Sequence, residues 1–315
     1  MTLSSLRRAR RKPRGADRAP NPHVVAAQTS RGYRTFRIFN ALILTGVVVV
    51  TLYPFVTIVA QSFSSESAIT AGHVNLVPRG FNLTTYKKVM SDSEFWQNYR
   101  NTVLYTVLAT AISMVLTTCY AYVLSKKNLK GRNVLVGVAL FTMFFNGGLI
   151  PNYVLVSNLG MRNTIWAIVL PNAINVFNLL VMKSFFENLP DELEEAAAVD
   201  GLGTYGILLR IVLPLSKAVL ATMVLFYAVS FWNSWFSAFL YMDHSHYFPV
   251  TVYLRNLIAG ATTGTDEGAS SDAALQIAAN IQAVTIVLTV IPILTVYPFI
   301  QKYFVSGVML GAVKG

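Results

Sequence analysis

Long apolar runs alternate with short polar segments along most of the chain. A helix needs about 20 residues to cross a hydrocarbon core about 30 Å thick. Six runs approach or reach that length, and none alternates with the period of two that a membrane β-strand shows. The expected membrane-spanning helices are residues 38–62, 100–125, 133–150, 164–187, 215–241 and 281–304. The pattern therefore predicts an all-α, polytopic membrane protein with six transmembrane helices.

Composition agrees with this pattern, since 54% of the residues are apolar and only 12% are charged. Six buried helices of a soluble protein would need polar faces, and these runs lack them. We expect four parts: a basic tail, a first transmembrane helix with an external segment, a membrane core, and a short C-terminal tail. Their bounds are 1–37, 38–97, 98–304 and 305–315.

The distribution of basic residues predicts the orientation. If the N-terminus is cytoplasmic, all but six of the 25 Lys and Arg residues fall on the cytoplasmic side. The six on the outside are Arg79, Lys87, Lys88, Arg100, Arg162 and Arg255. The positive-inside rule then places both termini, and the loop 188–214, in the cytoplasm. The arginine-rich tail is typical of a segment that contacts membrane lipid, so we expect no nucleic-acid partner.

The membrane-spanning runs lack charged residues over most of their length, as in 101–125 and 218–242. Ion-coupled carriers keep ionisable groups at this depth, so the absence argues against a carrier of that kind. The runs contain no acid–base pair for catalysis, and the chain has no phosphate-binding loop motif. We therefore expect a protein that is not an enzyme and holds neither a metal nor a cofactor. Energy from ATP would have to enter through a partner.

The loop between the fourth and fifth runs carries a spaced pattern, E-A-A-x3-G-x9-I-x-L-P, in an acidic segment. Its positions are Glu195, Ala196, Ala197, Asp200, Gly201, Ile211, Leu213 and Pro214. The pattern resembles the coupling-loop signature of the membrane subunits of binding-protein-dependent ABC importers. A charged helix and a glycine at fixed offsets are needed by a docking surface for another protein, but not by a plain membrane loop.

Capping rules predict the local structure of this loop. Asn188 can cap a helix beginning at Pro190, with acidic residues at the positive end of the helix dipole. Gly201 is expected to end that helix in the left-handed conformation. Thr204 can cap a second short helix that runs through Ile211. Pro214 is expected in the first turn of the fifth membrane helix.

Two further groups are candidates for a substrate path. Asn172, Asn175 and Asn178 recur every third residue and would lie roughly on one face of the fourth span. In the fifth span the candidates are Tyr227, Trp232 and Asn233. Amides and aromatic rings suit the hydroxyls and CH faces of sugars. Contacts between helices and anchoring at the membrane interface explain the same residue types and remain open.

Other segments resemble the carbohydrate-uptake, maltose-permease-like group of these importers. Asn-Leu-Thr-Thr-Tyr at 82–86 precedes the second span, and the segment 145–153 is similar to the subgroup for complex oligosaccharides and polysaccharide fragments. The resemblance covers about residues 38–315. It implies the type I ABC importer permease fold in a bacterial cell membrane, with coupling helices between spans four and five.

The resemblance also implies partners. They are a second permease subunit in a heterodimer, two ATPase subunits that bind ATP and Mg, and an external solute-binding protein. Glu195, Ala196 and Gly201 would contact the ATPase, and the outer segment 243–280 would face the binding protein. Composition alone predicts only a flexible loop for that segment. An importer for peptides or another small solute, and a membrane scaffold without a transport path, are the alternatives.

Overall fold

The structure is a computed structural model that describes residues 31–263, 280–296 and 298. Every regular element in these ranges is helical. The first elements are α2 (Arg31–Ser62), α3 (Glu66–Thr70), α4 (Thr84–Ser91), α5 (Ser93–Ser125), α6 (Arg132–Phe144), α7 (Leu149–Asn158), α8 (Trp166–Val169), η1 (Leu170–Asn172) and α9 (Val176–Glu187). They are followed by α10 (Asp191–Val199), α11 (Thr204–Ile207), η2 (Leu208–Val212), α12 (Leu213–Leu215), α13 (Lys217–Trp232), α14 (Phe236–Tyr241), η3 (Ser245–Tyr247) and α15 (Val250–Thr263). A further apolar helix spans Asn280–Val296.

The chain divides into two units within α2, at Val56. The part of α2 before this point is described by itself. Its large apolar side chains, such as Leu42 and Val50, are mostly exposed. This exposure is expected of a helix whose surroundings are lipid, because the backbone is satisfied internally and apolar side chains face hydrocarbon.

Length and composition support several membrane crossings. Gly32–Ser62 and Ser93–Ser125 are each long and apolar enough to span a membrane, and bent helix pairs raise the number to five if each pair is one span. The pairs are Arg132–Phe144 with Leu149–Asn158, Trp166–Asn172 with Val176–Glu187, and Thr204–Leu215 with Lys217–Trp232, bent by 113°, 52° and 86°. The sixth expected span, 281–304, extends beyond the described residues, so the count of six stays a prediction.

The third expected span, 133–150, is not one continuous helix. Helix α6 ends at Phe144, and the chain turns before α7. The Asn146 side-chain oxygen accepts a hydrogen bond from the Gly148 N–H at 2.9 Å. Gly148 has a φ of +97°, a conformation that suits glycine. The Asn-Gly-Gly sequence therefore builds a corner where the apolar pattern predicted continuity.

The fourth and fifth expected spans are also interrupted. In the fourth, Pro171 lies in the 3-10 turn η1, and Asn175 caps α9, which restarts the helix. In the fifth, α13 ends at Trp232, and α14 begins at Phe236. Each break contains only a few polar residues between apolar runs, Asn172 and Asn175 in the fourth span and Asn233 and Ser234 in the fifth, so the hydropathy of a whole span does not reveal it.

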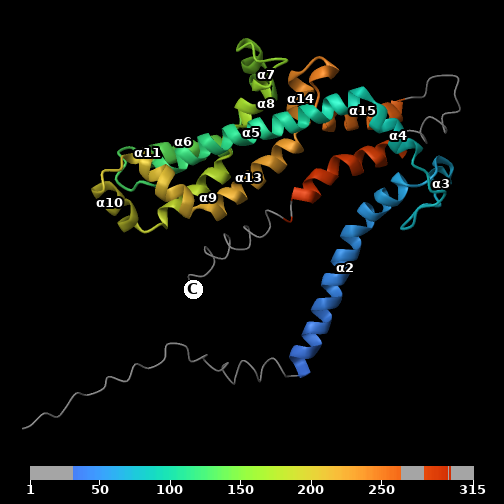
Figure 1. The fold of residues 1–315 in the computed structure, drawn as a ribbon, viewed down its shortest axis with the longest axis horizontal. Helices are drawn as coiled ribbons and strands as arrows, with labels where there is room; N and C mark the ends of the chain where they lie inside the picture. The colour runs from blue at the N-terminus through green and yellow to red at the C-terminus, as the bar shows by residue number, and fades with distance from the viewer. Residues whose placement is uncertain (1–30, 264–279, 297, 299–315) are drawn as a thin grey trace, which may run out of the picture. The chain divides into compact units, whose positions relative to one another are not determined.

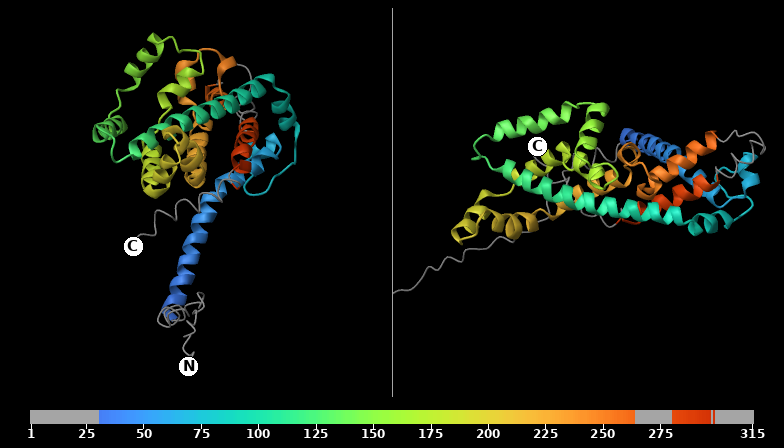
Figure 2. Two further views of the ribbon diagram at one scale, coloured as in Figure 1. Left: turned by 60° about the vertical axis from the view of Figure 1, so that its left-hand side comes forward. Right: turned by 90° about the horizontal axis from the view of Figure 1, so that it is seen from above.

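Helix α5 is the centre of the unit that begins at Thr57. Helices α13, α9, α15 and α8 all pack on it, and Figure 1 and the turned views in Figure 2 show it running along them. One end of α5 lies near α10 and α11, and the other lies near α4 and α15. We call these the coupling end and the opposite end.

The opposite end is more ordered than its composition predicted. The Asn101 amide on α5 donates to the carbonyl oxygens of His246 and Phe248 at 2.7 and 3.1 Å. The Val250 N–H donates to the Thr102 hydroxyl at 2.8 Å. The expectation of a flexible loop is therefore wrong for its first half, because side chains of α5 bind its backbone. Residues 264–279 of that loop lie outside the described residues.

Candidate coupling surface and substrate path

Helix α10 begins the predicted docking loop, with three acidic residues in its first turn: Asp191, Glu192 and Glu194. These charges stabilise the helix because its N-terminus carries a partial positive charge. The expected cap from Asn188 is not formed. Asn188 ends α9 instead, and its side-chain amide donates to the Ser184 carbonyl at 2.7 Å. Pro190 occupies the cap position of α10 without a side-chain hydrogen bond.

The end of α10 is a Schellman motif, as the glycine predicted. The Leu202 N–H donates to the Ala197 carbonyl, and the Gly201 N–H donates to the Ala198 carbonyl, both at 3.0 Å. Asp200 is the C-cap residue, and Gly201 has a φ of +84°. A side chain at this position would be strained, so the glycine fixes the turn between the two coupling helices.

The second helix of the loop differs from its expected form. Gly203 rather than Thr204 is its N-cap, and a π-helical turn follows α11 over Leu208–Val212. Pro214 lies in α12, before the 86° bend into α13, and not in the first turn of α13. Proline has no N–H to donate to the carbonyl four residues earlier, and a widened turn accommodates its ring.

The coupling loop has a buried side and an exposed side. On the buried side, Ala197 packs in an apolar cluster with residues of α5, α9, α11, η2 and α13, and Ile211 and Leu213 lie at its edge. On the exposed side lie Glu195 and Ala196. Two large apolar side chains near them, Val199 and Tyr205, are 88% and 81% exposed. An exposed apolar patch next to acidic residues is a typical contact surface for another protein.

Ion pairs join α10 to the C-terminal end of α5. Lys126 pairs with Glu194, and its ammonium also lies 4.1 Å from the centroid of the Tyr122 ring. The Tyr122 hydroxyl is 3.4 Å from the Glu194 carboxylate. Lys127 pairs with Asp191 at 3.4 Å. The acidic first turn of α10 is therefore attached directly to the central helix.

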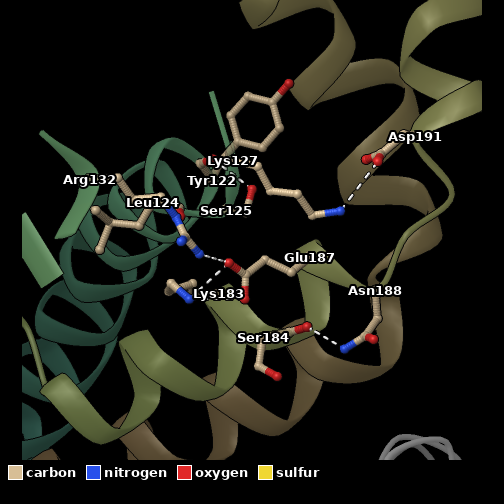
Figure 3. Close-up of polar contacts among 10 residues, drawn as sticks. All are labelled: Tyr122, Leu124, Ser125, Lys127, Arg132, Lys183, Ser184, Glu187, Asn188 and Asp191. Carbon is tan, nitrogen blue, oxygen red and sulfur yellow. Dashed lines mark hydrogen bonds and ion pairs between the residues drawn. The ribbon is translucent and has the colours of Figure 1, made fainter. Parts of the chain in front are cut away.

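A second network lies beside the first (Figure 3). Arg132, at the start of α6, pairs with Glu187 at the end of α9 and donates to the Leu124 carbonyl at 2.8 Å. Lys183 also pairs with Glu187, at 2.9 Å. The Glu187 carboxylate thus joins α9 to α6, and the Arg132 guanidinium joins both of these helices to α5. Sequence reasoning counted these basic residues only as orientation signals. The sign available in the sequence was Glu187, which follows Lys183 by four residues at the end of the fourth expected span.

The three asparagines of the predicted path do not share one helix face. Asn172 is in η1, Asn175 precedes α9, and Asn178 is inside α9. The Asn175 side-chain oxygen accepts from the Asn178 N–H at 3.1 Å, so Asn175 is a helix cap. Asn178 is buried, whereas Asn172 and Asn175 are exposed. The break in the fourth span removes the regular spacing on which the common face depended.

The three candidates of the fifth span also have different surroundings. Tyr227 is buried, and its hydroxyl accepts from the Asn175 N–H at 3.0 Å and lies 2.7 Å from the Thr117 hydroxyl. It therefore joins α13 to α5 and to the cap of α9. Trp232 is buried at the end of α13, while Asn233 is exposed and donates to the Val229 carbonyl at 2.8 Å.

Arg162, Asn163 and Asp243 form a polar cluster that we call the latch. Asp243 accepts from the Arg162 guanidinium at 2.6 Å and from the Asn163 amide at 2.8 Å. The Asp243 N–H donates to the Asn163 side-chain oxygen at 2.7 Å. The hydrogen bond from Asn163, together with the nearby Arg162, lowers the pKa of Asp243 below its ordinary value of 3.8. The latch joins the segment between α7 and α8 to the segment after α14.

This fold, with its interrupted apolar helices and an acidic surface helix joined to the central span, defines a membrane permease. The chain belongs to the family described as binding-protein-dependent transport system inner membrane component, which matches residues 121–310. It is a membrane component of an ABC importer with the type I permease fold.

Two proteins of Bacillus subtilis (strain 168) are similar over most of their length. One is Protein LplC, 42% identical over 90% of this chain and 96% of that protein. Another is the polygalacturonan/rhamnogalacturonan transport system permease protein YtcP, 40% identical over 89% of this chain and 99% of that protein. Among solved structures, a chain of a bacterial ABC transporter involved in the import of the acidic polysaccharide alginate is similar, with a TM-score of 0.80 and 35% identity. That similarity covers 87% of this chain and 98% of the other.

Proposed function

We propose that this chain is a permease subunit of an ABC importer for an oligosaccharide or polysaccharide fragment. Family membership gives the transporter class. Support for the cargo comes from similar proteins whose names specify polygalacturonan/rhamnogalacturonan and alginate. The observation that carries the proposal is the coupling loop: an exposed acidic and apolar surface, attached by ion pairs to the helix on which the other spans pack.

The exposed side of the loop is the proposed ATPase contact. Glu195, Ala196, Val199 and Tyr205 present the surface, and Gly201 sets the angle between the two short helices. ATP and Mg would bind in the two ATPase subunits, since this chain has no phosphate-binding loop motif. Movement of the ATPase surface would reach α5 through the ion pairs of α10.

The proposed substrate path is lined by fewer residues than the sequence predicted. Asn172, Asn175 and Asn233 are exposed and keep this role in the proposal. Asn178, Tyr227 and Trp232 are buried, so they would stabilise the helices that form the path without contacting the solute. The path would lie between this chain and a second permease subunit, which we expect to be a different chain. An external solute-binding protein would deliver the sugar at the opposite end.

Reconstitution of the complete importer tests the coupling role. Glu195→Lys reverses a charge on the exposed side and should abolish uptake and substrate-stimulated ATP hydrolysis without reducing the amount of permease in the membrane. Glu94→Lys makes the same charge change at the other end of α5, where Glu94 is also exposed, and should leave the binding of the ATPase subunits and their basal hydrolysis near wild type. Undiminished, substrate-stimulated hydrolysis in the Glu195 variant would refute the docking role.

Ligand identification on the purified binding protein tests the cargo. A sugar polymer fragment is the expected ligand, and a peptide or another small solute would replace the proposed cargo while keeping the importer class.

Orientation has its own test. Tags at residues 1 and 315 should be cytoplasmic, and a tag at residue 265 should be external. Protease protection of a tag at 265 in intact cells would contradict the proposed topology.

A further inference from the structure

At the opposite end, one arginine lies against two aromatic rings. Arg255 is on α15, and its guanidinium carbon is 4.9 Å from the centroid of the Trp235 ring and 4.2 Å from that of Phe239. Both rings belong to the segment after α13, and α14 packs against α15. Arg255 is half-buried, and both rings are partly exposed. Sequence reasoning used this arginine only as an external charge.

Stacking on rings orients a guanidinium without using its hydrogen-bonding capacity. The two rings are inclined by 52° to each other, so at most one of them lies parallel to the guanidinium plane; a contact with a ring face leaves the N–H donors at the edge of that plane available. Within the described part of the chain, no carboxylate forms an ion pair with Arg255, and no oxygen accepts a hydrogen bond from it. By contrast, the external Arg162 is paired with Asp243.

The helix that carries Arg255 is held firmly. Val250 and Val252 at its start are fully buried, and the Val250 N–H binds the Thr102 hydroxyl of α5. The Tyr253 hydroxyl donates to the Asp92 carboxylate at 2.7 Å. A cation supported in this way is already positioned for a ligand, because little conformational freedom is lost when the ligand binds.

The location fits a path for a polar solute. Helix α13 has 16 residues, so its end lies about 24 Å from its start at the coupling end. Trp235 follows this end and comes two residues after the exposed Asn233. Arg255 is expected on the outer side of the membrane, where a solute delivered from outside would enter the path. The exposed Asn233 and the Trp235 ring that contacts Arg255 therefore both lie at the break after α13.

We propose that Arg255, with Trp235 and Phe239, forms a binding site for the carboxylate of an acidic sugar unit. The inference rests on the proposed oligosaccharide cargo and specifies its chemistry. A guanidinium binds a carboxylate through two parallel hydrogen bonds, and the neighbouring rings suit the CH face of a sugar ring. The site selects uronate-containing fragments over neutral ones. A phosphate group of a lipid is the competing ligand for an arginine near the membrane surface.

Uptake of two matched sugars by the reconstituted importer tests this site. The probes are a galacturonate trisaccharide and its methyl ester, which has the same backbone but no charge. Each is supplied on saturated binding protein, and uptake is measured per assembled complex. Arg255→Gln should lower uptake of the acid by at least about tenfold while changing uptake of the ester by less than about twofold. Phe239→Leu keeps the charge and should give a smaller loss for the acid.

Arg100→Gln is the matched control. Arg100 is also an external arginine, but it lies exposed on α5. It should leave the uptake ratio of the two sugars unchanged. Equal losses for both sugars in Arg255→Gln would overturn the inference and point to lipid binding or a structural role. A wild-type complex that prefers the ester would also overturn it. Failure of the wild type to transport either sugar would instead refute the proposed cargo.

Discussion

The ion pair between Lys126 and Glu194 should hold α10 against α5 during each transport cycle. Lys126→Met and Glu194→Gln each remove one charge of the pair and keep a side chain of similar length. The side chains are only 36% and 23% exposed, and the lysine also lies over the Tyr122 ring. Such a pair is stronger than a fully exposed one, and we expect a coupling energy of about 1 kcal/mol.

A loss of about 1 kcal/mol increases the population of detached α10 about fivefold. The exposed surface of α10 remains intact, so ATPase subunits should still bind and turn over. Hydrolysis without transport should therefore rise about fivefold, and the number of sugar molecules imported per ATP should fall. The assay measures both rates in proteoliposomes containing the complete importer. The double variant should be no worse than either single variant, because both single changes break the same interaction.

The neighbouring pair of Lys127 and Asp191 provides the control. Its side chains are 67% and 75% exposed, and its charged atoms are 3.4 Å apart. Solvent screens such a pair, so Lys127→Met should cost less than about 0.5 kcal/mol and leave the ratio of transport to hydrolysis near wild type. Equal effects from the two pairs, or additive losses in the Lys126 and Glu194 double variant, would refute the role of this attachment.

Changes at four other residues have expected results that thermal unfolding of the purified permease complex can check. Gly201→Val should destabilise the permease by about 1–2 kcal/mol, since a β-branched residue is strained at a φ of +84°. Asn175→Leu should cost about 0.5–2 kcal/mol through loss of the α9 cap, while Asn175→Asp retains the cap and tests the path itself. Tyr227→Phe should cost about 1–3 kcal/mol, because it leaves the Asn175 N–H without its acceptor. Asp243→Asn should lower the melting temperature at neutral pH. The pKa of Asp243 is lowered in the folded state, so its contribution is present above the ordinary value of 3.8, and the difference from wild type should disappear as pH falls below it.

The amino-acid sequence by itself determined the class of this protein. Six apolar runs that lack charge over most of their length predict helices in lipid, because no other open structure satisfies the backbone there. The spacing from Glu195 to Pro214 predicted a coupling loop, and Gly201 marked the turn within it, since only a residue tolerant of positive φ ends a helix in this way. These features depend on local chemistry and chain length, which a sequence contains directly.

The positions of the breaks in the spans depended on more than hydrophobicity. Long apolar runs flank both the corner at Gly148 and the interruption after Trp232, so the hydropathy of the span did not distinguish a straight helix from a bent one. The break before α9 removed the continuous face expected for the three asparagines, and it gave Asn175 a second role as a helix cap with a hydrogen bond to α9.

Only the tertiary structure decided which distant side chains meet. Lys126 and Glu194 are 68 residues apart, and Asn101 and His246 are 145 residues apart. Arg255 was one of several external charges until the packing of α15 on α14 placed it against Trp235 and Phe239. Such contacts arise from the packing of helices around α5. The periodicity of one segment specifies which of its faces is apolar, but it does not specify which helix covers that face.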